Sequence, residues 1–123
     1  MTIVIDESMS TYRPRKYKTR ELAPLSYIRM KPKPLGTEFK VACDASTGCM
    51  LFVEIQDGKD AMRAARFVKE LGVATATSVR CAIGAASEAT GHTVVGDFWF
   101  GSVKVAASNL YVVFIVCHVV FML

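Results

Sequence analysis

The sequence lacks the closely spaced cysteine pairs of zinc-binding and redox motifs. Its four cysteines stand at positions 43, 49, 81 and 117, and neither His92 nor His118 lies at ligand spacing from a cysteine pair. A zinc site is therefore not expected. The chain also lacks a basic, apolar leader, because Asp6 and Glu7 interrupt its start. These absences indicate reduced intracellular thiols that pack as small hydrophobic groups.

Acidic residues are scarce in the first third of the chain. Residues 1–40 hold nine Lys/Arg against four Asp/Glu, a net charge of +5, whereas residues 41–123 hold six against seven, a net charge of −1. A basic arm on a near-neutral body favours a polyanionic partner such as nucleic acid. The alternative is a solvated basic segment that binds nothing in particular. With 123 residues, of which 52% are hydrophobic, the chain is long enough for one modest core.

Basic residues alternate with tyrosines from Tyr12 to Arg20, a pattern that can follow a phosphate backbone and stack on bases. Pro14 disfavours a helix here, and the prolines between Met30 and Leu35 predict a second extended segment. The candidate DNA-binding residues are Arg13, Arg15, Lys16, Lys18, Arg20, Lys31 and Lys33.

Two predicted strands each end in an aspartate. Residues 38–44 alternate between apolar and polar positions and end at Asp44, where a turn leads into a second β-rich run at 49–56. Residues 92–97 form a short apolar run that ends at Asp97. Adjacent strands would bring the two carboxylates together, where they can hold a divalent metal ion. The alternative for Asp44 is a turn-starting residue with no chemical role.

Helical periodicity lies between the two aspartates. Asp60 is a plausible N-cap of a helix that Gly72 ends, and residues 74–88 predict a second helix despite their β-branched threonines. Residues 98–107 resemble the start of another helix that packs on the sheet. The alternation of strands and helices predicts an α/β fold.

The last nineteen residues, Val105 to Leu123, contain no charged side chain. Their length approaches that of a membrane span, but Ser108, Asn109 and His118 dilute the apolar run. A buried strand in the first half is the better interpretation.

Several segments, in order along the chain, resemble the piggyBac transposase domain. They include the acidic pair in I-D-E-S-M, Y-I-x-x-K-P, the strand that ends in C-D, and G-H-T-V-V-G-D followed by W-F. They lie at residues 5–9, 27–32, 40–44 and 91–100. The resemblance implies an incomplete ribonuclease H-like α/β fold, with N-terminal strands, a helix and a strand that carries the second aspartate. It also implies DNA cleavage and strand transfer in the parent family, a nuclear location, and Mg²⁺ or Mn²⁺ as cofactor, although this chain could hold none.

By the same resemblance, Asp44 matches the first catalytic and metal-binding aspartate and Asp97 the second. The family's third aspartate would lie beyond Leu123, Phe98 replaces the usual asparagine, and the pattern is lost after about residue 115. We therefore expect a basic lead-in (1–36), a partial transposase core (37–115) and a divergent hydrophobic tail (116–123).

Three functional classes follow. The leading hypothesis is an inactive transposase fragment, and the second is a non-catalytic DNA-binding remnant that uses the basic arm. The third and least favoured class is a small tail-anchored membrane protein. DNA is the expected partner, with an intact transposase or a second copy of the chain as further candidates.

Overall fold

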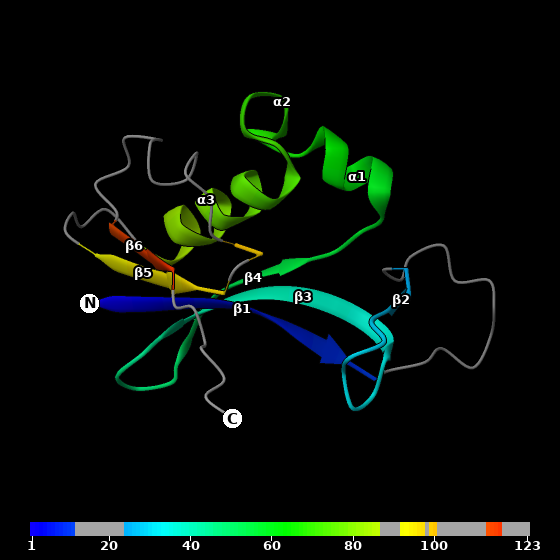
Figure 1. Ribbon diagram of the computed structural model, residues 1–123, viewed down its shortest axis with the longest axis horizontal. Coiled ribbons are helices and arrows are strands. Elements are labelled where there is room, and N and C mark those ends of the chain that lie inside the picture. The colour runs from blue at the N-terminus through cyan, green and yellow to red at the C-terminus, as the bar shows by residue number, and fades with distance from the viewer. Residues whose placement is uncertain (12–23, 87–91, 98, 101–112, 117–123) are drawn as a thin grey trace.

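The computed structural model describes residues 1–11, 24–86, 92–97, 99–100 and 113–116, the last four by their backbone alone. Helices lie on one side of a mixed sheet (Figure 1). The strands are β1 (Thr2–Ser10), β2 (Ser26–Tyr27), β3 (Leu35–Asp44), β4 (Met50–Ile55), β5 (Thr93–Gly96) and β6 (Val113–Val116). The helices are α1 (Lys59–Ala64), α2 (Val68–Leu71) and α3 (Val73–Ala85). The expected α/β class is confirmed.

Strand β1 is central to the sheet, whose order is β2-β3-β1-β5-β6, with β4 paired to β3. β1 runs antiparallel to β3 and parallel to β5. This strand begins at Thr2 and continues through the acidic pair Asp6 and Glu7 to Ser10. Part of the segment expected as a lead-in thus belongs to the sheet.

The core lies between the sheet and α3. Ile3 and Ile5 of β1 are at most 1% exposed, because alternate residues of a strand share one face. They belong to a buried cluster that also contains Ala42, Cys81, Ala82, Ala85, Val94 and Phe100. Small residues on α3 let the helix approach the sheet closely, and a Cβ atom at Gly84 would overlap the ring of Phe52.

Helix α3 confirms the helix predicted at residues 74–88, although it ends at Ala85. Thr77 is buried, and its Oγ1 donates a hydrogen bond of 2.8 Å to the carbonyl of Val73, so the buried hydroxyl group has a partner. Arg80 fastens α3 to β4 through two hydrogen bonds of 2.7 Å to the Glu54 carboxylate. These contacts offset the low helix propensity of the β-branched residues.

The helix predicted from Asp60 to Gly72 is broken into α1 and α2. Phe67 adopts a left-handed conformation with φ of 68°, which interrupts the helix. Gly58, and not Asp60, occupies the N-cap of α1. Gly72 ends α2 as predicted, with φ of 82°.

The Pro/Lys segment is a turn, so the extended conformation predicted from Met30 to Leu35 is wrong. The Ile28 amide donates a hydrogen bond to the carbonyl of Pro34, and the Lys31 amide donates one to Ile28. β2 then pairs antiparallel with the start of β3, which closes a hairpin. The hydrogen bonds of this hairpin favour a reversal of the chain over an extended spacer.

Several predictions lie wholly or partly outside the described residues. These are the basic arm at 12–20, most of the segment 98–107, and the tail beyond Val116. Strand β6 (Val113–Val116) confirms β-structure within the uncharged run, but it begins only where the first half of that run ends. No helix within the described ranges is long and apolar enough to cross a membrane.

Candidate functional site

The two aspartates predicted to share a site lie far apart, and the expectation that they come together is wrong. Strand β1 separates β3 from β5, and β3 runs antiparallel to both. Asp44 pairs with Ile3, whereas Asp97 follows Gly96, which pairs with Ile5. Asp97 is therefore three residues further along β1 than Asp44, which at 3.3–3.4 Å per residue is roughly 10 Å along the strand direction. The two residues are also separated across the sheet, because β1 lies between their strands.

Asp44 starts a turn, as the alternative interpretation proposed. Its carboxylate accepts hydrogen bonds from the Ser46 amide, the Ser46 hydroxyl and the Thr47 hydroxyl, at 2.9–3.1 Å. The Ser46 backbone amide, followed by the two hydroxyl groups, lowers the pKa of the Asp44 carboxyl below its ordinary value. In this structure Asp44 cannot bind the same metal ion as Asp97.

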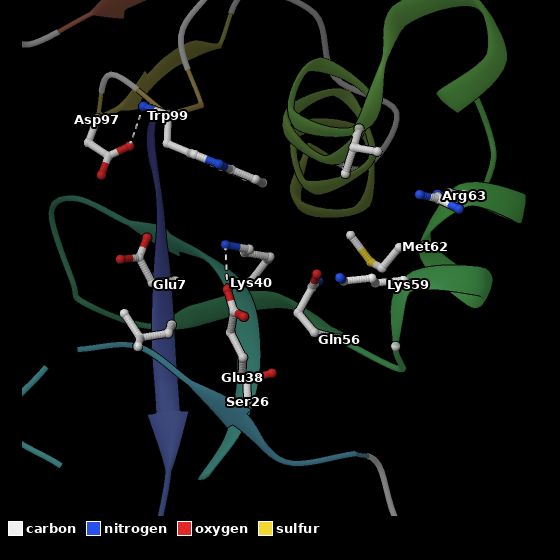
Figure 2. Close-up of a pocket in the computed structure, with 13 residues that line it drawn as sticks. Glu7, Ser26, Glu38, Lys40, Gln56, Lys59, Met62, Arg63, Asp97 and Trp99 are labelled. Carbon is white, nitrogen blue, oxygen red and sulfur yellow. Dashed lines mark hydrogen bonds and ion pairs between the residues drawn. The ribbon is translucent and has the colours of Figure 1, made fainter. Parts of the chain in front are cut away.

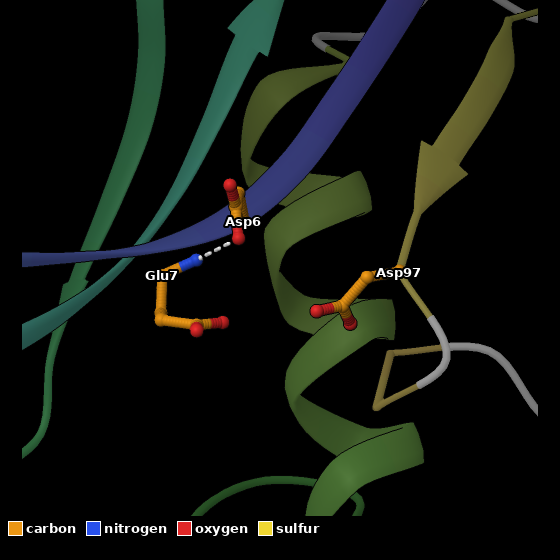
Figure 3. A group of neighbouring side chains, drawn as sticks. All are labelled: Asp6, Glu7 and Asp97. Carbon is orange, nitrogen blue, oxygen red and sulfur yellow. Dashed lines mark hydrogen bonds between the residues drawn. The ribbon is translucent and has the colours of Figure 1, made fainter. Parts of the chain in front are cut away.

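A different set of carboxylates meets at the end of β5. One oxygen from each of Asp6, Glu7 and Asp97 lies within 4.8 Å of the others (Figure 3). The register explains this meeting, because Ile5 pairs with Gly96 and the next residues are therefore neighbours. We call Asp6, Glu7 and Asp97 the acidic cluster.

The sequence held a signal for the acidic cluster that the predictions did not use. In the sequence, Asp6 and Glu7 were considered only as residues that interrupt a leader and as the acidic pair of the family resemblance. A strand that continues through an acidic pair, parallel to a second strand that ends in an aspartate, places all three carboxylates at one edge. To predict that arrangement one must know the order of the strands in the sheet, and local sequence patterns do not specify this order.

Two hydrogen bonds fix the Asp97 carboxylate. Its Oδ1 accepts the amide of Trp99 at 2.9 Å and the amide of Phe100 at 3.4 Å. The Phe100 side chain is 1% exposed, and its carbonyl accepts a 2.7 Å hydrogen bond from the Ser78 hydroxyl of α3. The turn after β5 is therefore anchored to the core.

Lys40 supports the same turn from the sheet. Lys40 is only 5% exposed, and its Nζ atom lies 2.7 Å from Glu38 Oε1. The ammonium group also lies 4.0 Å from the centroid of the Trp99 ring and 5.2 Å from that of Phe100. A buried cation is stabilised by this combination of a carboxylate and two aromatic faces.

Lys31, a predicted DNA-binding residue, forms an ion pair with Glu7 of the acidic cluster. Its Nζ lies 3.1 Å from Glu7 Oε1. Burial acts to raise the pKa of Glu7, but the hydrogen bond and charge of Lys31 outweigh it and lower that pKa. Lys33 is exposed on the hairpin. The predicted residues Arg13, Arg15, Lys16, Lys18 and Arg20 lie outside the described residues.

A cavity of about 570 Å³ adjoins the acidic cluster. Glu7 and Asp97 line one end and α1 lines another, with Lys40 and Gln56 between them (Figure 2). The acidic cluster therefore stands at the wall of a cavity large enough for a small organic ligand.

The donor atoms of the acidic cluster fit a hard divalent cation. Carboxylate oxygens are the ligands that Mg²⁺ and Mn²⁺ prefer. Mg²⁺ binds oxygen at 2.0–2.1 Å, so opposite ligands lie roughly 4 Å apart. At most two of three ligands can be opposite in an octahedron, and neighbouring oxygens lie roughly 3 Å apart, so the cluster oxygens, which lie within 4.8 Å, would have to move closer together around the ion. Such an ion would polarise a phosphoryl oxygen and lower the pKa of a bound water molecule.

A solved structure resembles the chain over most of its length. It is a cryo-EM structure of a piggyBac transposase synaptic complex with hairpin DNA, and it matches with a TM-score of 0.72 at 18% sequence identity. The match covers 92% of this chain and 22% of that transposase. It confirms the expected transposase α/β fold, and this chain spans about a fifth of the protein it resembles.

Sequence comparison identifies the family. No curated protein sequence matches the chain. A family profile described as Transposase IS4 matches residues 1–117, nearly the whole chain. The chain therefore belongs to the Transposase IS4 family and shares its fold with a piggyBac transposase.

Proposed function

We propose that this chain is a segment of a transposase core that binds one divalent metal ion at the acidic cluster and contacts DNA, without cleaving DNA by itself. The observation that carries the proposal is the meeting of Asp6, Glu7 and Asp97 within 4.8 Å. Asp6 and Asp97 are the exposed members and would be the principal ligands. Mg²⁺ or Mn²⁺ is the proposed ion.

The absence of cleavage follows from the number of carboxylates. A two-metal site needs ligands for two ions about 3.5–4 Å apart. Within the described residues the acidic cluster supplies three carboxylates, and Lys31 engages that of Glu7. This set suits one ion. The protein would therefore bind metal but would not support the paired activation of nucleophile and leaving group.

Titration with Mn²⁺, followed by electron paramagnetic resonance, tests the metal site. We expect D6N and D97N each to weaken Mn²⁺ binding at least tenfold, because each removes a charged ligand. D44N is the matched control, since Asp44 is an aspartate of the same sheet outside the cluster, and it should leave the affinity unchanged. Equal affinities for D97N and the wild type would contradict the proposal.

A nicking assay on supercoiled DNA tests the second half of the proposal. We expect no product with Mg²⁺ or Mn²⁺. Cleavage that D97N abolishes would show that this chain is an active nuclease and would overturn the inactive assignment. The metal-binding result would stand in either case.

The second candidate is a DNA-binding remnant located in the nucleus. Exposed Lys33 and the basic residues from Arg13 to Arg20 favour it, because neutralising phosphates with Lys and Arg gives affinity without sequence preference. Alanine at these positions should reduce both the affinity for duplex DNA and its salt dependence. An unchanged salt dependence would reject this candidate.

A further inference from the structure

We propose that Trp99 and Lys40 are positioning residues for Asp97: together they hold the turn after β5 so that the Asp97 carboxylate is in place before a metal ion arrives. This inference rests on the proposed function, because it assumes a metal ion at the acidic cluster. Neither residue is itself a ligand, since an indole ring and a protonated amine offer no lone pair to a cation. All three side chains line the cavity (Figure 2).

Asp97 keeps one carboxylate oxygen for a ligand. Its Oδ1 atom accepts the backbone amides of Trp99 at 2.9 Å and of Phe100 at 3.4 Å. Its Oδ2 atom accepts no hydrogen bond from another described residue. Both donors are backbone groups of the turn, so the orientation of the carboxylate is set by the conformation of the turn. Whatever fixes the turn therefore also fixes this metal ligand.

The Trp99 ring ties the turn to the sheet. Lys40 Nζ lies 4.0 Å from the centroid of this ring and 2.7 Å from Glu38 Oε1, and the lysine side chain is 6% exposed. The Trp99 ring also meets the Phe100 ring edge to face, with centroids 4.8 Å apart. A buried ammonium group attracts an aromatic face more strongly than an exposed one, because little water competes for the charge. The ring, although 42% exposed, is thus held in one place.

Helix α3 holds the same turn through a second contact. The Ser78 hydroxyl donates a 2.7 Å hydrogen bond to the Phe100 carbonyl, and both residues are at most 1% exposed. The Phe100 amide donates in turn to the Asp97 carbonyl at 3.1 Å. A ligand that is already ordered in the free protein loses less conformational entropy when it binds. Because partners behind metal ligands commonly change metal affinity by about 10- to 100-fold, we expect these contacts to control the affinity of the acidic cluster.

Lys40 makes the direction of the effect informative. It pairs with Glu7 in the register of β1 and β3, so its charge lies near the acidic cluster. Loss of a neighbouring cation would by itself strengthen the binding of a metal ion, because one repulsive charge is removed. Loss of a positioning residue weakens binding instead. The two roles of Lys40 therefore predict changes of opposite sign in Lys40→Met.

The test is Mn²⁺ titration of the full chain, followed by electron paramagnetic resonance. Trp99→Leu keeps every charge and the amide that binds Asp97, and we expect it to weaken Mn²⁺ binding about tenfold. Trp99→Phe restores an aromatic face and should return the affinity to within about threefold of the wild type. Lys40→Met should also weaken binding, against the electrostatic expectation. Gly84→Ala is the matched control for lost stability, because its Cβ atom would overlap the Phe52 ring without touching the turn, and it should leave the affinity unchanged.

Trp99 is the only tryptophan of the chain, so time-resolved fluorescence anisotropy reports the motion of its ring. We expect no fast rotation of the ring in the wild type, with or without Mg²⁺. Lys40→Met should show fast rotation without metal, and Mg²⁺ should suppress it, because the ion orders Asp97 and Asp97 binds the Trp99 amide. A residue that served stability alone would not make the mobility of Trp99 respond to the metal ion.

Circular dichroism at the titration temperature checks that each variant is folded, as we expect for Trp99→Leu because Trp99 is partly exposed. Equal Mn²⁺ affinities of Trp99→Leu and the wild type would overturn the inference. Tighter or unchanged binding in Lys40→Met would do the same, as would ring mobility in that variant that Mg²⁺ does not change.

D97N separates this failure from a failure of the proposed function. If D97N binds Mn²⁺ as tightly as the wild type, the acidic cluster is not the metal site and both proposals fail. If D97N weakens Mn²⁺ binding and Trp99→Leu does not, only the positioning role is rejected.

Discussion

The Nζ atom of Lys40 lies 4.0 Å from the centroid of the Trp99 ring, and this contact joins the centre of the sheet to the turn that carries Asp97. Lys40→Met should destabilise the fold by about 2 kcal/mol, because it leaves the Glu38 carboxylate unpaired and removes the cation from two rings. Urea unfolding monitored by Trp99 fluorescence measures this change in the free energy of unfolding. Lys69→Met is the exposed control. Equal unfolding midpoints for both variants would argue against a structural role of Lys40.

We expect Lys31 to oppose metal binding at the acidic cluster. The pKa of Lys31 is raised first by the hydrogen bond to Glu7, with contributions from the charges of Glu7, Asp6 and Asp97. Lys31→Gln should tighten Mn²⁺ binding roughly threefold to tenfold, because a competing cation is removed. Lys33→Gln on the same hairpin is the control. Weaker binding in Lys31→Gln would mean that Lys31 instead orders Glu7 for the ion.

Gly84 permits the close approach of α3 to β4. In a helix, alanine is more favourable than glycine by about 1 kcal/mol. Its Cβ atom at position 84 would overlap the Phe52 ring, however, and such overpacking costs about 1–3 kcal/mol. We expect Gly84→Ala to be net destabilising in chemical unfolding. Adding Phe52→Leu should recover part of the loss, as expected for two residues in contact. A stabilised Gly84→Ala would show that the ring moves freely.

Burial raises the pKa of the Cys81 thiol to about 12. The folded state then keeps a proton that the unfolded state releases near pH 9, so stability from this group is complete below pH 9 and falls as pH rises towards 12. The decline approaches about 1.4 kcal/mol per pH unit. Cys81→Ala should remove this component of the decline in unfolding measurements between pH 9 and 11.

Thiol labelling checks the same environment. Exposed Cys49 should react with iodoacetamide at pH 8, whereas Cys81, which is 0% exposed, should react only after unfolding. Peptide mapping by mass spectrometry separates the two sites. Rapid labelling of Cys81 in the native protein would contradict its burial.

Most local elements were predictable from the sequence. The alternation of apolar and polar residues predicted β3, and the turn residues after Asp44 predicted where it ends. Helical periodicity predicted helical structure on both sides of Gly72. The break at Phe67 was not predictable, because a left-handed conformation is uncommon for phenylalanine and no local pattern signals it. The Pro/Lys hairpin was missed for a related reason, since its hydrogen bonds join residues whose local preference is extended.

The sequence by itself determined the α/β class, the strands that lead to Asp44 and Asp97, and the family, because these depend on local patterns and ordered motifs. Only the tertiary structure decided which carboxylates meet. Insertion of β1 between β3 and β5, antiparallel to one and parallel to the other, sends Asp44 to one end of the sheet and brings Asp6 and Glu7 to Asp97. Strand order is a non-local property that arises from packing of the whole sheet, so no single segment encodes it.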